Sequence, residues 1–481
     1  MSNQIKEITL KSVKWVTLAQ ILPKLISPII SVVLLTVFKP EDYGVIGICN
    51  AFISFFNMLQ GFGFADFIIR MKDEDENTIY TAYWFNIFLS FVLFVILLIL
   101  TPLIAYIYSE EKLIFYLPTL SLNLIINSIG LIPWAILRKQ MQFRKLFYIN
   151  FAPLIVSVIV TLPLGYLNFG PWAIIIGQIT LTILTNIFYI KIKSWSFIFL
   201  FDKRKIKEII NFSKFVFFER LQEYIYENID VFIIGYFLGL DILGKYVLAK
   251  SISLIIFNLI NSNVNGILYP AFQKFSDDLV KIRKNFLEVE KRVFFINIPI
   301  IIFMTLNASN LITIIFPQKW VEVAPIISII LIGDGIAKSF SIQRDIFKLL
   351  GKPEIYPKSF LINLSFAILV YTIITQFGFI LFLLAKVIND ILFSVIQYVL
   401  SKRELKYKNN EFFNNLKPIL LSALGMILFN ILFIKFLPYN LFYIVLTLIL
   451  SASIYLTFFY LLDRISFLNI LKESKIILGF N

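Results

Sequence analysis

The chain has 481 residues, of which 59% are hydrophobic and 15% charged, and its formal net charge is +14. A water-soluble fold cannot bury that much apolar surface, so the composition excludes a soluble enzyme and predicts a protein that lies in a bilayer. Cys49 is the one cysteine and there is no histidine, which excludes an internal disulfide, a Cys/His zinc site and histidine-based acid–base catalysis. We therefore expect no metal, no bound cofactor and no enzymatic activity.

Apolar runs of about twenty residues recur along the whole chain, and that is the length a helix needs to cross the hydrocarbon core of a membrane. We predict about fourteen membrane-spanning helices, at residues 14–38, 43–69, 80–108, 113–137, 146–168, 171–191, 213–237, 244–270, 293–316, 321–343, 358–377, 379–400, 418–437 and 439–462. The first run is long enough to span and lacks a small-residue cleavage site, so we expect a helix there and not a signal peptide.

The basic residues predict the orientation of these helices. Most of the 44 lysines and arginines fall in segments that face the cytoplasm if the N-terminus is inside, for example residues 138–145 and 203–207. Cytoplasmic loops of membrane proteins carry such an excess. The pattern predicts that both termini are cytoplasmic, and it accounts for the positive net charge without a nucleic-acid partner.

An internal repeat relates two parts of the chain with an offset of about 200 residues. Lys14-Trp15 aligns with Lys214-Phe215, and the turn at Pro40–Gly44 aligns with Leu240–Gly244. Six predicted spans separate the copies, so both copies enter the membrane from the same side, as in a parallel repeat about an axis along the membrane normal. We predict an all-α polytopic membrane protein in three parts. These are two pseudo-twofold-related six-helix lobes, residues 1–200 and 201–403, and two additional C-terminal helices in residues 404–481.

Several short motifs resemble those of a known family. Phe38-Lys39-Pro40-Glu41-Asp42-Tyr43-Gly44 lies in the first lobe, and Leu243-Gly244-Lys245-Tyr246 and Leu268-Tyr269-Pro270-Ala271-Phe272 follow in the second. In this order they resemble the polysaccharide exporters, the O-antigen and colanic-acid type (Wzx-like) flippases of the multidrug/oligosaccharidyl-lipid/polysaccharide superfamily. The resemblance implies a fold like that of the multidrug (MATE) transporters.

The same resemblance implies a function in the bacterial cytoplasmic (inner) membrane. Such a flippase moves a polyprenyl-diphosphate-linked oligosaccharide, the repeat unit of an O-antigen, capsule or exopolysaccharide, from the cytoplasmic to the outer leaflet by alternating access. Its partners would be membrane lipid and the lipid-linked glycan. We expect a monomer, with the polysaccharide polymerase machinery as a candidate associate.

Ionised side chains also fall inside the predicted spans. Each costs about 2.5–3.5 kcal/mol at the membrane centre, so such groups face a cavity or a partner. In the seventh span, Glu219, Glu223, Glu227 and Asp230 follow i, i+4, i+8, i+11, which places them in one arc of about 80° on a helix. This acidic stripe predicts a helix face that lines water or meets basic residues.

We divide the intramembrane charges by role. The predicted substrate-binding residues for the diphosphate are Lys24, Arg220, Lys250, Lys338 and Lys386. The predicted acidic residues of the cavity, or of ion coupling with Na+ or H+, are Glu223, Glu227, Asp230, Asp334 and Asp390. Asp334/Lys338 and Lys386/Asp390 are i, i+4 pairs, so each pair could instead neutralise itself on its own helix.

Amides in the second span, including Asn57 and Gln60, leave two interpretations open: contacts between helices, or groups that bind sugar. Other functions also remain open. One is a multidrug/cation antiporter of the related MATE family, whose cavity would favour acidic residues. Another is an oligosaccharide polymerase or ligase, although these enzymes carry a long external loop that the predicted spans do not allow. A third is a scaffold without transport activity.

Overall fold

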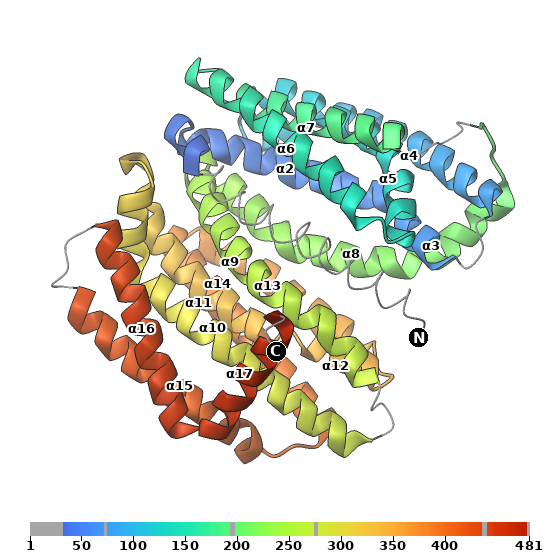
Figure 1. The fold of residues 1–481 in the computed structure, drawn as a ribbon. Coiled ribbons are helices and arrows are strands. Elements are labelled where there is room, and N and C mark those ends of the chain that lie inside the picture. Colours follow the sequence, from blue (N-terminus) through green and yellow to red (C-terminus); the bar gives the residue numbers. More distant parts are fainter. Residues whose placement is uncertain (1–31, 72–74, 193–197, 274–277, 435–439, 479–481) are drawn as a thin grey trace. The chain divides into compact units, whose positions relative to one another are not determined.

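The computed structural model describes residues 32–71, 75–192, 198–273, 278–434 and 440–478, and these residues are helical with short connections. The chain divides into two compact units, Met1–Val247 and Leu248–Asn481. Figure 1 shows the helices of each unit. The first predicted span, residues 14–38, lies largely outside the described residues.

The first unit is a helical bundle with short links. Its helices are α2 (Pro40–Gly61), α3 (Phe64–Arg70), α4 (Glu76–Ile107), α5 (Leu113–Lys139), α6 (Phe143–Tyr166), α7 (Pro171–Ile192), α8 (Lys203–Leu238) and the first turns of α9 (Leu240–Gln273). Helix α4 packs mainly on α5, α6 on α7, and α2 on α8 and α5. Met141 and Asn168 adopt positive φ angles of 55° and 62° in the links after α5 and α6. These left-handed residues end one helix and reverse the chain into an antiparallel neighbour.

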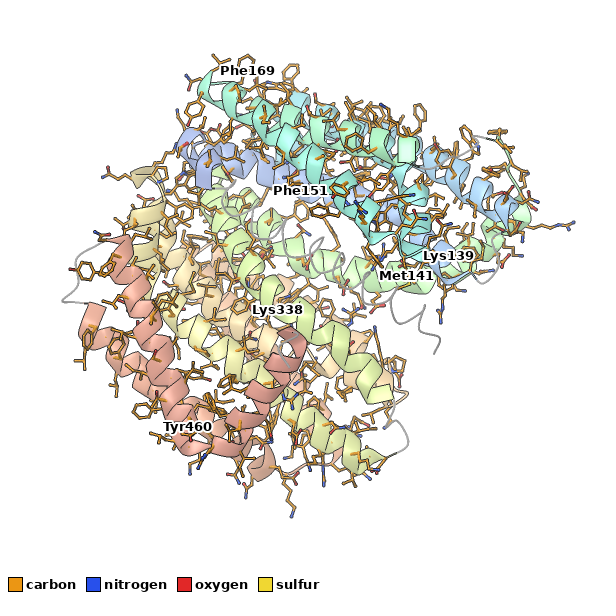
Figure 2. All side chains as sticks on the ribbon, viewed as in Figure 1. Lys139, Met141, Phe151, Phe169, Lys338 and Tyr460 are labelled. Carbon is orange, nitrogen blue, oxygen red and sulfur yellow. The ribbon has the colours of Figure 1, made fainter. Side chains whose placement is uncertain are left out.

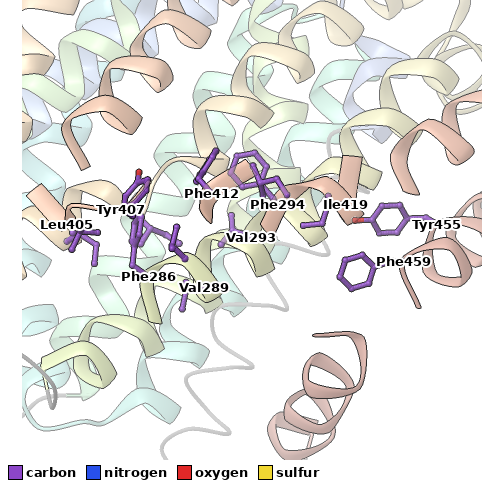
Figure 3. Packing of buried hydrophobic residues seen from close by; sticks show 14 of the residues in the cluster. Phe286, Val289, Val293, Phe294, Leu405, Tyr407, Phe412, Ile419, Tyr455 and Phe459 are labelled. Carbon is purple, nitrogen blue, oxygen red and sulfur yellow. The ribbon is translucent and has the colours of Figure 1, made fainter. Parts of the chain in front are cut away.

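The second unit continues from α9 and includes the C-terminal helices. It contains α10 (Leu279–Ile315), α11 (Val323–Ser339), α12 (Gln343–Leu349), α13 (Ile355–Thr375), α14 (Phe379–Leu405), α15 (Asn409–Ile434), α16 (Leu441–Leu462), α17 (Arg464–Leu478) and the short 3-10 helix Gln318–Trp320. A buried aromatic and aliphatic core joins α10, α15 and α16, with Phe294, Phe412 and Phe459 among its residues (Figure 3). The two helices predicted as a C-terminal addition therefore pack directly on α10.

Eleven helices among the described residues are long and apolar enough to cross a membrane. They coincide with eleven of the fourteen predicted spans. Helices α8 and α9 lie at the predicted seventh and eighth spans and are long enough, with 36 and 34 residues, and α8 is the more polar of the two. Many large apolar side chains are exposed, such as Ile99 on α4 and Phe169 in the link after α6, and such surface suits lipid. Phe169 is labelled in Figure 2. The chain is thus an all-helical membrane protein.

A reciprocal contact between α2 and α9 agrees with the predicted repeat. A Cβ atom on Gly44 would lie 1.8 Å from the carbonyl oxygen of Leu240, and one on Gly244 would lie 1.7 Å from that of Pro40. The two contacts are equivalent under the 200-residue offset: Gly44 meets Leu240, and Gly244 meets Pro40. A two-fold axis produces such reciprocal pairs. Only glycine permits two helix backbones to approach this closely.

Candidate functional site

The structure divides the acidic stripe of α8. Glu223 and Glu227 are exposed, whereas Asp230 is buried with 3% of its surface accessible. Asp230 accepts hydrogen bonds from the hydroxyl of Tyr246, at the start of α9, and from the backbone N–H of Val231. Helical spacing alone predicted that all four carboxylates would share one face. Tyr246 of α9, sixteen residues further along the chain, covers the last of them, Asp230.

Arg220 forms an ion pair with α3. Its Nη2 atom donates to Oδ2 of Asp66 at 2.5 Å, and the side chains are 40% and 39% exposed. Gly63 places α3 for this contact: its φ is +80°, and a Cβ there would lie 3.0 Å from the Ser213 side chain on α8. A residue with a side chain would be strained at this turn. Arg220 is therefore paired, yet 40% of its side-chain surface remains exposed.

The second unit contains a more buried cluster. Lys386 on α14 donates to Oδ1 of Asp334 on α11 and to Oδ2 of Asp390 on its own helix, both at 2.8 Å. Ser253 on α9 donates to the other Asp334 oxygen at 2.7 Å. The Lys386, Asp334 and Asp390 side chains are 10%, 17% and 2% exposed. Lys250 lies near enough to stabilise the Asp334 carboxylate electrostatically.

This cluster shows which of the two predicted i, i+4 pairs, Asp334/Lys338 and Lys386/Asp390, forms in the structure. The Lys386/Asp390 pair forms within its helix, as the i, i+4 spacing allowed. Among the described residues, the ion-pair partner of Asp334 is Lys386 and not Lys338. Buried Gly333 helps α11 and α14 approach, because a Cβ there would lie 3.0 Å from Asp390 Oδ2. The charges of two helices thus pair across the interface between them.

The remaining predicted residues lie apart from these clusters. Lys338 is half-buried in the last turn of α11 (Figure 2). Lys24 lies outside the described residues. The structure brings Lys250, Asp334, Lys386 and Asp390 together in the second unit, and it gives Arg220 a partner in the first. The roles of all these residues in binding or ion coupling stay predictions.

Two residues that the predicted site omits complete these clusters. Asp66 pairs with Arg220, and its charge inside a predicted span was the signal that could have identified it. Ser253 follows Lys250 by three residues and so shares its helix face, but a serine in an apolar span carries little signal by itself. Within the described residues, no group of three His, Cys, Asp or Glu side chains could hold a metal ion.

The helices define an all-α polytopic membrane protein, and solved structures share its fold. The inward closed lipid II flippase MurJ is 16% identical and superimposes with a TM-score of 0.72, covering 93% of this chain and 98% of that one. An inward-facing multidrug resistance MATE family transporter of the MOP superfamily is 13% identical with a TM-score of 0.61, covering 82% and 98%. These similarities establish the fold.

Residues 33–325 match the polysaccharide biosynthesis protein family, and the chain belongs to that family. The teichuronic acid biosynthesis protein TuaB of Bacillus subtilis (strain 168) is 31% identical over 278 residues. That match spans 56% of each chain, so it covers little more than half of this relative. The lipopolysaccharide biosynthesis protein WzxC of Escherichia coli (strain K12) is 23% identical over 68% of this chain and 67% of its own. The predicted family is confirmed.

Proposed function

We propose that this protein is a flippase that moves a polyprenyl-diphosphate-linked oligosaccharide between the leaflets of a membrane by alternating access. Family membership supports a role in polysaccharide assembly. The names of the relatives concern teichuronic acid and lipopolysaccharide, and MurJ is titled a lipid II flippase. Lipid II is itself a lipid-linked glycan, so a shared fold and a related substrate class support the same kind of movement here.

The observation that carries the proposal is the half-exposed Arg220 of α8. It lies within a predicted span, where an ionised group needs a partner or water. Asp66 satisfies only part of a guanidinium that can make several hydrogen bonds in a plane. A diphosphate, with more charge and more acceptor oxygens, would compete with Asp66 for this group.

We further propose that the protein lies in the bacterial cytoplasmic membrane with both termini in the cytoplasm. The distribution of lysine and arginine supports this orientation. Translocation then runs from the cytoplasmic to the outer leaflet, with Na+ or H+ as a candidate coupling ion and the acidic residues as its carriers. An impermeant thiol reagent applied from outside should miss Arg138→Cys and label Asp241→Cys; external labelling of Arg138→Cys would overturn the orientation.

A reconstituted assay tests the flippase directly. The purified full chain is placed in liposomes that contain undecaprenyl-diphosphate-linked N-acetylglucosamine in both leaflets. A soluble galactosyltransferase with radiolabelled UDP-galactose is added outside, where it modifies only outer-leaflet molecules. We expect wild-type protein to make the inner-leaflet pool accessible and empty liposomes to retain it.

The same vesicles separate the proposal from the antiporter alternative. A pH or sodium gradient is imposed and the movement of ethidium, a cationic dye, is followed by fluorescence. Gradient-driven ethidium transport, with the inner-leaflet sugar lipid still inaccessible, would favour a multidrug antiporter and contradict the flippase proposal.

A further inference from the structure

An open cavity of about 330 Å³ lies between α2, α5, α6 and α7 of the first unit, and its lining is part polar and part apolar. Five amide side chains line it: Asn57, Gln60, Asn127, Asn150 and Asn186. Trp134 and Tyr189 add two aromatic rings. Among the described residues that line it, none is Lys, Arg, Asp or Glu. The cavity is therefore distinct in chemistry from the charged clusters of α8 and α14.

Polar stripes on otherwise apolar helices produce this lining. On α7, Thr182, Thr185, Asn186 and Tyr189 recur at the spacing of one helix face, with Thr185, Asn186 and Tyr189 facing the cavity. On the other side of α7, Ile183, Ile187 and Ile190 are exposed, as a lipid-facing surface requires. Asn127, Gly130 and Trp134 form the matching stripe of α5. Several spans thus turn polar residues toward one cavity.

Contact between helices accounts for Gln60, whose Nε2 atom donates to the Leu124 carbonyl of α5 at 3.1 Å. Among the described residues, Asn186 forms no such hydrogen bond to another helix. Its Nδ2 atom donates to the Thr182 carbonyl of its own helix at 2.8 Å. The side chain is 4% exposed, and its Oδ1 atom has no hydrogen-bond partner among the described residues. Gly130 makes room for that oxygen, since a Cβ there would lie 2.2 Å away. A buried acceptor without a partner costs about 1–3 kcal/mol, so a rotation of this amide that turns Oδ1 toward a ligand in the cavity would be stabilising.

Asn430 in the second unit shows what an amide that joins helices looks like. Its Nδ2 atom donates to Ser451 Oγ on α16 at 3.0 Å, and its Oδ1 atom accepts from Asn307 Nδ2 on α10 at 3.0 Å. The amide bridges three helices and both its ends are satisfied. Asn186 has a similar burial but lacks the bridging role.

The cavity chemistry suits an uncharged, hydroxyl-rich molecule. Amides both donate and accept, which matches sugar hydroxyls, and aromatic rings pack on the C–H face of a pyranose. Without a countercharge, an ionic ligand would lose its hydration uncompensated. The volume has room for about eleven non-hydrogen atoms at the density of liquid water, which is about the size of one hexose.

We propose that this cavity binds one neutral sugar residue of the translocated glycan and so selects the substrate by its sugar. The role of the cavity in selecting a substrate rests on the proposed flippase function. Binding of a free sugar to the cavity can be measured whether or not the protein is a flippase. The cavity thus assigns sugar recognition to the first unit, apart from the recognition of the diphosphate.

Equilibrium binding of free sugars tests this site. The purified full chain in lipid nanodiscs is titrated with N-acetylglucosamine, glucose and galactose, and with glucuronate as an acidic sugar of similar size. Tryptophan fluorescence reports occupancy, because Trp134 lines the cavity. We expect a saturable change with a neutral sugar and none with glucuronate, and Trp134→Phe should lose the signal. Absence of any saturable change with the three neutral sugars, or an equal response to glucuronate, would overturn the proposal.

A matched pair of variants separates a ligand from a packing residue. Asn186→Ala should weaken sugar binding about three- to tenfold, the loss of one neutral hydrogen bond, with little change in thermal unfolding. Asn430→Ala should lower the unfolding temperature and leave sugar affinity unchanged. If Asn186→Ala lowers the unfolding temperature as Asn430→Ala does and leaves affinity unchanged, the cavity is a packing interface. The translocation assay is independent: sugar binding without translocation would contradict only the flippase function, and translocation without sugar binding only this site.

Discussion

The Arg220–Asp66 pair of the first unit and the Lys386 cluster of the second use similar chemistry in different surroundings. In the first, a guanidinium meets one carboxylate and about two fifths of each side chain is exposed. In the second, one ammonium lies between two carboxylates and all three side chains are mostly buried. A serine completes the hydrogen bonding of Asp334.

The difference in burial separates a structural cluster from an exchangeable one. Removing one partner from a buried pair leaves an uncompensated charge and costs about 3–5 kcal/mol. An accessible pair contributes about 0–1 kcal/mol to stability, so another anion can replace its carboxylate with little loss of stability. We therefore expect Lys386 to hold α14 and α11 together, and Arg220 to be available for a substrate.

The largest effect should follow Lys386→Ala. The change removes the ammonium that pairs with both Asp334 and Asp390, in a site that excludes most water. We expect a destabilisation of about 3–5 kcal/mol. The folded yield in detergent and the unfolding temperature, followed by size-exclusion chromatography of a fluorescent fusion, measure it.

Neutralising a partner provides the control for Lys386. The double variant Lys386→Ala with Asp390→Asn removes one stranded charge and should recover part of the yield. If Lys386→Ala folds as well as wild type, the buried cluster is not structural, and the contrast with Arg220 disappears.

The second effect concerns Arg220→Ala. We expect the stability to change by less than about 1 kcal/mol, because the pair is exposed. Translocation in the liposome assay should be abolished, and Arg220→Lys should recover part of it, since an ammonium contacts a diphosphate without the planar fork of arginine. A loss of folded protein that Asp66→Asn rescues would instead make this pair structural, like that of Lys386.

Thiol labelling sharpens the comparison along α8. Cysteines at Glu223 and Glu227 should react with a small polar thiol reagent several times faster than cysteines at Asp230 and Val231. The native Cys49 is buried and gives a low background. A stripe that lined water along its whole length would react at Asp230 as well, so equal labelling at Glu223, Glu227 and Asp230 would contradict the burial of Asp230 by Tyr246.

Local patterns predicted the helices well and their contacts poorly. Eleven described spans followed from hydropathy, because hydropathy depends on local composition and length. The partner of Asp334 could not be predicted: Lys386 is 52 residues away, and only the packing of α11 on α14 brings them together. Asn127, Asn150 and Asn186 were not singled out, since an amide in a span gives no local sign of whether its oxygen finds a partner.

The smallest effect belongs to an ion pair outside the spans. Asp75 caps α4 by accepting from the backbone N–H of Asn77 and pairs with Lys205 at 2.9 Å. Hydrogen bonds from Thr78 and then Lys205 lower the pKa of Asp75 from 3.8 to about 2. A carboxylate with a lowered pKa contributes stability above its unfolded pKa, and that stability is lost as the pH falls from about 4 through 2.

Asp75→Asn tests this third pair. Asparagine also caps helices, so the variant removes the ion pair and keeps the cap. Because the two side chains are about one third exposed, we expect a loss below about 1 kcal/mol at neutral pH, reduced further by high salt. As the pH falls from 4 to 2, the wild type should lose this small advantage and approach the variant, as measured by the unfolding temperature. A difference in unfolding temperature between wild type and variant that stays constant down to pH 2 would show that the ionised carboxylate does not stabilise this end of α4. A loss of stability as large as that of Lys386→Ala would show that burial does not determine how much the ion pairs of this protein contribute.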